Sequence, residues 1–227
     1  GGAAAPSAAQ GVGNLVHAAA MLADDAAADR AVLLKWLTER FDAIEHAAVW
    51  LAEAERERAE SMVDKLVRWV ARNPRRLLAI ERDFVVRLGD AELRGRVDRL
   101  EVDETGRLVV VDLKTGKAAP PADDIAGHPQ LGAYQAAIEA GAFAEYGTEP
   151  GGAALVQLGT PAKDAREQTQ PPLSQAEDPG WAARLVRRTG QVMAAATFTA
   201  VRNDRCRVCP VRTSCPISGK GRQVVRP

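Results

Sequence analysis

Gly95-Arg-Val-Asp-Arg-Leu100 and, after a short turn, Leu108-Val-Val-Val-Asp-Leu-Lys114 form the stretch that decides the fold. The second segment is rich in the aliphatic residues typical of strands, and the Gly-containing turn at Asp103–Gly106 suits a hairpin with the first. The second segment begins as an apolar run, which is typical of a strand that is buried on both faces. Because side chains alternate along a strand, Asp112 and Lys114 are expected on one face at the end of that run.

The carboxylates of this hairpin indicate chemistry. A carboxylate at the end of a buried strand costs free energy unless a cation or hydrogen-bond donors compensate it. Asp-x-Lys by itself is common and can simply terminate a strand, but Asp98 lies on the preceding strand, where pairing could bring its carboxylate to that of Asp112. Hard divalent cations such as Mg²⁺ are held by one or two carboxylates together with water and phosphate. The hairpin therefore predicts a shared divalent-metal site with Lys114 beside it.

Periodicity in the rest of the chain predicts an α/β fold. Helices are expected over residues 13–27 and from residue 29 through Trp50 and Leu51, where Ile44 and Ala47 continue the apolar face. Further helices are expected in a stretch that ends before Pro74, over 133–140 with a start near Pro129, and over 181–196. Strands are expected at residues 84–88, 93–102, 108–114 and 153–158, and a polar loop at 161–180. We expect one domain with a central mixed β-sheet flanked by helices, in which a helical region (1–80) precedes a catalytic core (81–200) and a basic, cysteine-containing segment (201–227).

The hairpin resembles the active-site hairpin of the RecB-like nucleases in the PD-(D/E)XK superfamily. Two further motifs stand in the family's order: Gly13-Asn-Leu-Val-His17 resembles its G-x-x-x-H helix, and Gln130-Leu-Gly-Ala-Tyr134 resembles its Q-L-x-x-Y motif. Taken separately, His17 could be an ordinary core or surface histidine, Gln130 a polar edge residue and Tyr134 a packing aromatic. Their joint occurrence with the hairpin favours the family, and it implies a PD-(D/E)XK nuclease core.

The resemblance also implies a role for each motif residue in metal-assisted hydrolysis of DNA phosphodiester bonds. Its implied ligands for Mg²⁺ or Mn²⁺ are His17, Asp98, Asp112 and the main-chain carbonyl of Leu113. Lys114 would orient the attacking water or stabilise charge on the phosphate, and Gln130 and Tyr134 would position Lys114 or the scissile phosphate. The family favours an exonuclease over an endonuclease, although the residues themselves set neither this nor the polarity of digestion.

Three cysteines close to the C-terminus, Cys206, Cys209 and Cys215, indicate a metal site rather than a disulfide framework. Reduced structural cysteines and a zinc site both fit this spacing. The spacing also resembles the last three cysteines of the iron–sulfur site in the AddB and AdnB branch of the family, whose fourth cysteine lies upstream of the G-x-x-x-H helix. Because the chain has only three cysteines, we expect it to be a fragment of a longer helicase–nuclease, with a 4Fe-4S cluster that is incomplete or absent here.

The net charge of zero conceals an asymmetry. From Arg184 to the C-terminus the chain carries ten basic side chains and one acidic one, a net charge of +9, so that residues 1–183 carry −9. Such a segment suits a polyanion, and its candidate DNA-binding residues are Arg184, Arg187, Arg188, Arg202, Arg205 and Arg207. A solvated tail that never contacts DNA is the alternative.

Several function classes are excluded or disfavoured. The chain has no G-x-x-x-x-G-K-[ST] motif, so a helicase motor is expected elsewhere in the polypeptide or in a partner subunit. No apolar stretch approaches the roughly 20 residues of a membrane helix, and no secretory signal is recognisable, which predicts a cytoplasmic protein without a membrane. A catalytically inactive DNA-binding scaffold and a zinc-stapled nucleic-acid-binding module are the competing hypotheses; the intact set of motif residues argues against the first.

Overall fold

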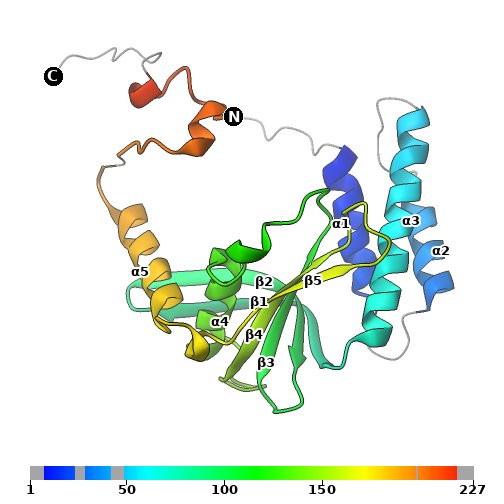
Figure 1. Cartoon of the computed structure of the whole chain (residues 1–227), viewed down its shortest axis with the longest axis horizontal. Helices are drawn as coiled ribbons and strands as arrows, with labels where there is room; N and C mark the ends of the chain where they lie inside the picture. Colours follow the sequence, from blue (N-terminus) through cyan, green and yellow to red (C-terminus); the bar gives the residue numbers. More distant parts are fainter. Residues whose placement is uncertain (1–7, 24–28, 42–48, 198, 219–227) are drawn as a thin grey trace.

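The computed structural model describes residues 8–23, 29–41, 49–197 and 199–218. Three helices come first: α1 (Ala8–Ala20), α2 (Arg30–Phe41) and α3 (Val49–Arg72). They lie together on one side of the sheet (Figure 1). Among the described residues, no helix is both long enough and apolar enough to cross a membrane.

The sheet has five strands in the order β1-β2-β3-β4-β5. The strands are β1 (Arg76–Leu88), β2 (Ala91–Val102), β3 (Leu108–Lys114), β4 (Pro150–Gln157) and β5 (Arg166–Gln170). Only β3 and β4 pair in parallel, because α4 (Pro129–Glu139) connects them; the other neighbours are antiparallel. The predicted mixed sheet flanked by helices is confirmed.

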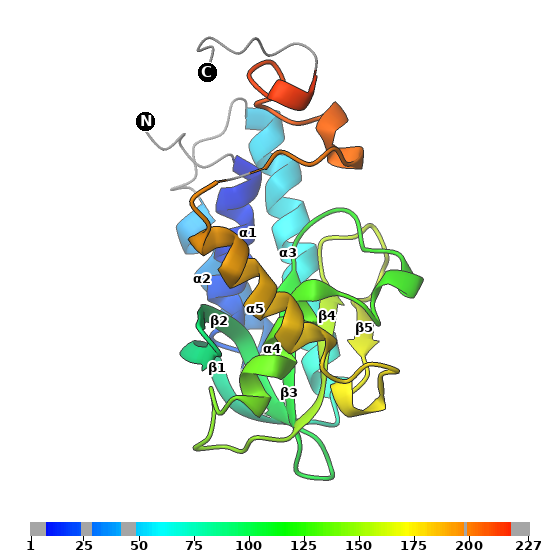
Figure 2. The same ribbon diagram turned by 90° about the vertical axis from the view of Figure 1, so that its left-hand side faces the viewer.

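Alternation along β3 gives the two faces of the sheet different partners. Val109, Val111 and Leu113 pack with the α1–α3 layer, whereas Leu108 and Val110 pack on the side of α4. The last helix, α5 (Trp181–Ala194), covers the same face as α4 (Figure 2). Asp112 and Lys114 lie two and four residues after Val110, so their side chains are on the same face of the strand and point toward α4.

The strand predictions were too short at the start of β1 and missed β5. The strand expected at 84–88 begins eight residues earlier, at Arg76. Its first part is a half-buried edge strand whose charged residues interrupt the apolar pattern. The boundary predicted at residue 80 consequently falls inside β1. The loop predicted at 161–180 contains β5, which has no apolar residue. Its buried residues are Gln168 and Gln170, which make amide hydrogen bonds such as that from Gln170 Nε2 to the Ile125 carbonyl at 2.9 Å.

The helix predictions differ mainly in their ends. The stretch predicted from residue 29 onward is two helices, α2 and α3, and the predicted Ile44 and Ala47 lie outside the described residues. α1 ends at Ala20 rather than at residue 27; residues 24–27 also lie outside the description. α5 ends two residues before the predicted position.

A buried ion pair joins the α1–α3 layer to the sheet. Arg99 and Glu101 of β2 are both fully buried, and Arg99 Nε donates to Glu101 Oε1 at 2.9 Å. The same guanidinium donates through Nη1 to the carbonyl of Ala23, just after α1, at 2.7 Å. Arg75 Nε donates to the other carboxylate oxygen at 2.8 Å. The strand that carries Asp98 is thereby fixed to the end of the helix that carries His17.

Candidate active site

Asp98 lies where β2 separates from β3. The paired register of the two strands ends at Arg99 opposite Val111, so the next positions along them are Asp98 and Asp112. Asp98 Oδ2 accepts a hydrogen bond from the main-chain N–H of Leu113 at 2.6 Å. The Asp98 carboxylate is therefore held against the segment that carries both Asp112 and Lys114, as the hairpin predicted.

His17 reaches the same carboxylate from α1. Its Nδ1 lies 3.4 Å from Asp98 Oδ1, and the hydrogen bond to Asp98 raises the pKa of His17 above its usual value although burial opposes this. Gly13 lies one turn earlier on the same helical face. A Cβ atom there would lie 2.9 Å from Thr115 Oγ1, so glycine allows α1 to approach the loop after β3 closely.

Glu81 is a third member of this cluster, and sequence reasoning missed it. One donor atom from each of His17, Glu81 and Asp98 lies within 4.8 Å of the others. Glu81 stands opposite Asp98 in the β1–β2 register, between the pairs Ile80–Arg99 and Arg82–Val97. Its φ of 48° is in the left-handed region, which costs a non-glycine residue about 1–3 kcal/mol and occurs often at functional sites. The run Glu81-Arg-Asp83 gave no signal, because a charged run usually marks a solvated surface.

Asp112 and Lys114 share a second cluster with α4. Lys114 Nζ lies 2.7 Å from Asp112 Oδ2 and donates to Gln130 Oε1 at 2.9 Å. Gln130 Nε2 donates to Asp112 Oδ1 at 2.7 Å, and Tyr134 Oη donates to the same oxygen at 3.2 Å. The structure thus brings together all four of these predicted residues.

The environment of Asp112 suits a cation. The residue is 5% exposed, and burial raises the pKa of its carboxyl group even though Lys114 opposes this. Its Oδ2 is buried, and the Lys114 ammonium lies 2.7 Å away as its ion-pair partner. Burial also raises the pKa of Tyr134, which remains a neutral donor. Carboxylate oxygens with one imidazole form a donor set suited to Mg²⁺ or Mn²⁺.

The two clusters divide the predicted metal ligands. His17 and Asp98 converge with Glu81, whereas Asp112 belongs to the lysine cluster and is not part of the close group of three donors. The Leu113 peptide joins the two clusters, since its N–H binds Asp98 while its neighbours in sequence are Asp112 and Lys114. Ligation through the Leu113 carbonyl stays a prediction.

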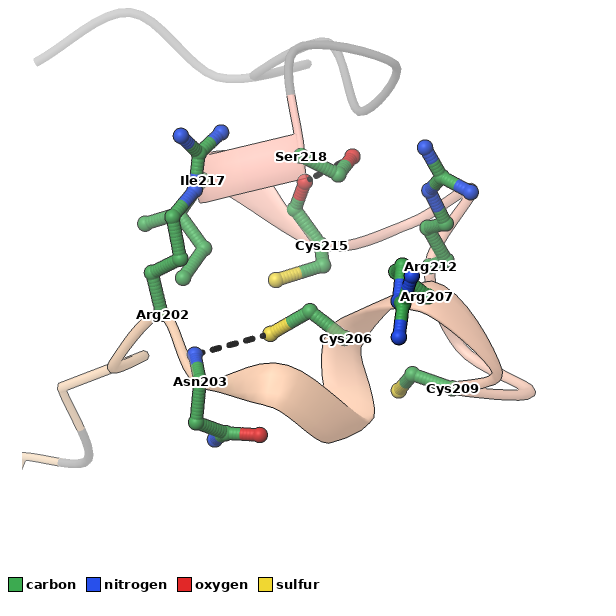
Figure 3. A pocket seen from close by; sticks show the side chains of 9 residues that line it. All are labelled: Arg202, Asn203, Cys206, Arg207, Cys209, Arg212, Cys215, Ile217 and Ser218. Carbon is green, nitrogen blue, oxygen red and sulfur yellow. Dashed lines mark hydrogen bonds between the residues drawn. The ribbon is translucent and has the colours of Figure 1, made fainter.

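The three cysteines line one pocket in residues 201–218 (Figure 3). All three are free thiols, and Cys206 Sγ accepts a hydrogen bond from the Asn203 N–H at 3.3 Å. In the part of the chain that the structure describes, the three sulfur atoms do not all lie within 4.8 Å of one another.

The arginines predicted to bind DNA lie on two surfaces. Arg187 and Arg188 are exposed on α5, and Arg184 beside them is ion-paired with Asp178. Arg202 and Arg207 line the cysteine pocket. Arg205 is exposed on the same segment, where its N–H is bound by the Asn203 side chain.

Comparison with known proteins identifies the class of protein that this fold and site define. The family model of the PD-(D/E)XK nuclease superfamily matches residues 2–216, and the chain belongs to that superfamily. No curated protein sequence matches the chain. A solved structure described as "Crystal structure of SSO0001" is similar to this chain with a TM-score of 0.41 and 16% identity, covering 91% of this chain and 85% of that one.

Proposed function

We propose that this chain is a Mg²⁺- or Mn²⁺-dependent deoxyribonuclease. One observation carries the proposal: the three donors of His17, Glu81 and Asp98 meet within 4.8 Å at the strand end where Asp112 and Lys114 also lie. Membership of a nuclease superfamily supports the hydrolytic activity. The intact cluster favours catalysis over an inactive scaffold.

The residues of the two clusters would have different roles in phosphodiester hydrolysis. A divalent cation bound at such a site polarises the phosphate and lowers the pKa of a bound water. His17, Glu81, Asp98 and Asp112 would hold it. Lys114, whose ammonium is oriented by Gln130 Oε1, donates toward charge that develops on the phosphate. Gln130 and Tyr134 also fix the Asp112 carboxylate, because both donate to its Oδ1.

The biological setting that we propose is a helicase–nuclease that processes DNA ends in recombinational repair, with an exonuclease activity. The resemblance to the RecB-like nucleases supports this setting, and the motor would lie elsewhere in the polypeptide or in a partner subunit. The cysteines extend the proposal. They supply three of the four thiolates that a 4Fe-4S cluster ordinarily requires, so a cysteine from an upstream segment would complete the site in the longer protein.

Digestion of DNA tests the proposed activity. Single-stranded and linear duplex DNA are incubated with the protein and Mg²⁺ or Mn²⁺, beside an RNA of the same sequence. We expect loss of DNA that stops on chelation of the metal and is absent from the Asp98→Ala variant. Cleavage of RNA alone would contradict the DNA substrate, and undiminished cleavage by Asp98→Ala would contradict the assigned site.

A further inference from the structure

A basic groove leads away from the candidate active site along α3. It consists of two pockets: one is lined by His17 and the loop of residues 115–117, and the other by α3 and the loop of residues 158–161. Arg58 and Lys117 line both pockets, so the two are contiguous. The groove therefore starts beside a candidate metal ligand and continues past the ends of two strands.

The described side chains that line the basic groove carry charge of one sign. They include Arg58, Lys65 and Lys117 and no acidic side chain. This contrasts with residues 1–183 as a whole, which carry a net charge of −9. A concave surface lined by one sign of charge concentrates ligands of the opposite sign. The groove thus fits a polyanion, although residues 1–183 as a whole carry a net negative charge that would repel one.

Two of these cations are already occupied by the protein. Lys65 Nζ donates to the carbonyls of Leu158 and Thr160, at 3.0 and 2.6 Å. Arg58 donates to the carbonyl of Thr115 and, at 3.0 Å, to Glu55. Both side chains therefore hold the loops that form the rim of the groove.

Lys117 is the cation that remains for a ligand. It is exposed and, within the described part of the chain, makes no hydrogen bond or ion pair. It lies three residues after Lys114, and its pocket also contains His17. An ammonium group at this place can meet a phosphate without first breaking an internal contact.

The position of the loops agrees with ligand binding. They follow the parallel strands β3 and β4, and ligands of open α/β sheets bind outside the carboxyl ends of such strands. The loops contact each other: Leu158 N–H donates to the Lys114 carbonyl at 2.8 Å, and a Cβ on Gly159 would lie 2.0 Å from the Thr115 carbonyl oxygen. Among the residues that the structure describes, no aromatic side chain lines the groove, so none of them offers a surface for stacking on bases.

We propose that the basic groove binds the sugar–phosphate backbone of the DNA strand next to the scissile bond, and that Lys117 pairs with a flanking phosphate. The inference rests on the proposed function, because the ligand is the strand that is cut. Arg58 and Lys65 shape the groove rather than contact the phosphate, and recognition there is independent of base sequence.

Removal of the Lys117 charge tests the proposal. In steady-state cleavage of a single-stranded oligonucleotide with Mg²⁺, Lys117→Ala should raise KM about tenfold, the effect of one charge-assisted contact, and change kcat less than twofold. The slope of log affinity against log salt should become shallower by about 0.7, the value for one phosphate on a single strand. Lys117→Arg should restore both, and Lys35→Ala, which removes an exposed lysine of α2 outside the groove, should alter neither.

The outcomes separate the two proposals. If the wild type cleaves DNA but Lys117→Ala keeps its KM and salt slope, the groove proposal is overturned and the nuclease proposal stands. If the wild type cleaves nothing, the proposed function fails, and binding of the same oligonucleotide by fluorescence anisotropy still decides the groove. Equal affinities and salt slopes of wild type and Lys117→Ala in that measurement would again overturn it.

Discussion

The active-site end of the sheet and the cysteine segment at residues 201–218 carry their functional side chains in different ways. At the sheet end, residues far apart in sequence meet: Gln130 of α4 bonds to Asp112 of β3 at 2.7 Å, and His17 of α1 approaches Asp98 of β2. In the cysteine segment none of the residues is buried, and its turns are held by local contacts such as Ser218 Oγ to the Cys215 carbonyl at 2.8 Å.

The difference separates two ways in which a candidate site can be built. The first is organised by the packing of the whole domain, so its donors converge on one another by folding alone. The second has three cysteines at short spacing, and under the proposed iron–sulfur assignment a bound cluster would supply the free energy that packing supplies in the first. Substitutions at the sheet end should therefore have large effects on activity or stability. Substitutions in the cysteine segment should have small effects on the stability of the core.

The largest effect is expected from the lysine cluster. Lys114→Ala should lower kcat by roughly 10²- to 10³-fold or more, because a preorganised donor to the developing charge is lost. Asp112→Ala should abolish cleavage, while in metal-free buffer Asp112→Asn should melt no lower than the wild type, since burial raises the pKa of Asp112 and so penalises its ionised form. DNA digestion and thermal melts measure both. Full activity of either alanine variant would remove the cluster from the mechanism.

The buried ion pair should dominate stability. Glu101→Leu leaves the fully buried Arg99 without its carboxylate, and breaking such a pair typically destabilises a fold by about 3–5 kcal/mol. The melting temperature should fall by roughly 10 °C for a domain of this size. Glu104→Leu, on the exposed hairpin turn, is the matched control and should change little. The Arg99→Leu/Glu101→Leu double variant should be more stable than Glu101→Leu; a double variant that is equally unstable would contradict the pairing.

Metal affinity should depend on pH through His17. Its pKa is raised because protonated His17 pairs with Asp98, so in the metal-free protein this pairing stabilises the fold at low pH and is lost as the pH rises through the raised pKa. A cation needs the neutral imidazole, so Mn²⁺ affinity should fall about tenfold per pH unit below that pKa. Titration of Mn²⁺ by electron paramagnetic resonance measures this. His17→Asn should flatten the dependence, and an equally steep profile would show that His17 is not a ligand.

The sequence predicted most of the lysine cluster and only part of the acidic one. The hairpin and the Gln130–Tyr134 helix carry local patterns, period two and a spacing of four, that place side chains on a defined face. Glu81 has no such pattern, because its role arises from the β1–β2 register and an unusual backbone angle. Its approach to His17 requires tertiary structure.

The missed strand β5 has a related cause. Hydrophobic periodicity detects burial that the hydrophobic effect drives, whereas Gln168 and Gln170 are buried by hydrogen bonds to main-chain carbonyls of the segment between β3 and α4. Arg99 was likewise not expected in the core, because its partners Glu101 and the Ala23 carbonyl become apparent only when α1 packs on the sheet. A polar side chain is buried where hydrogen-bond partners await it. When those partners are distant in sequence, the local sequence pattern does not reveal the burial.

The smallest effect on the core is expected from the cysteines. Cys206→Ser and Cys215→Ser should change the unfolding free energy of the sheet core by less than about 0.5 kcal/mol, as for other surface positions, because neither residue is buried. In a longer chain with a cysteine upstream of α1, the same substitutions should instead abolish iron and sulfide binding and the associated visible absorbance, since four thiolates then close the site. Zinc without iron in that longer chain would contradict the iron–sulfur assignment. A drop of several degrees for Cys206→Ser in the present chain would show that this segment already depends on the core, and the contrast between the two regions would fail.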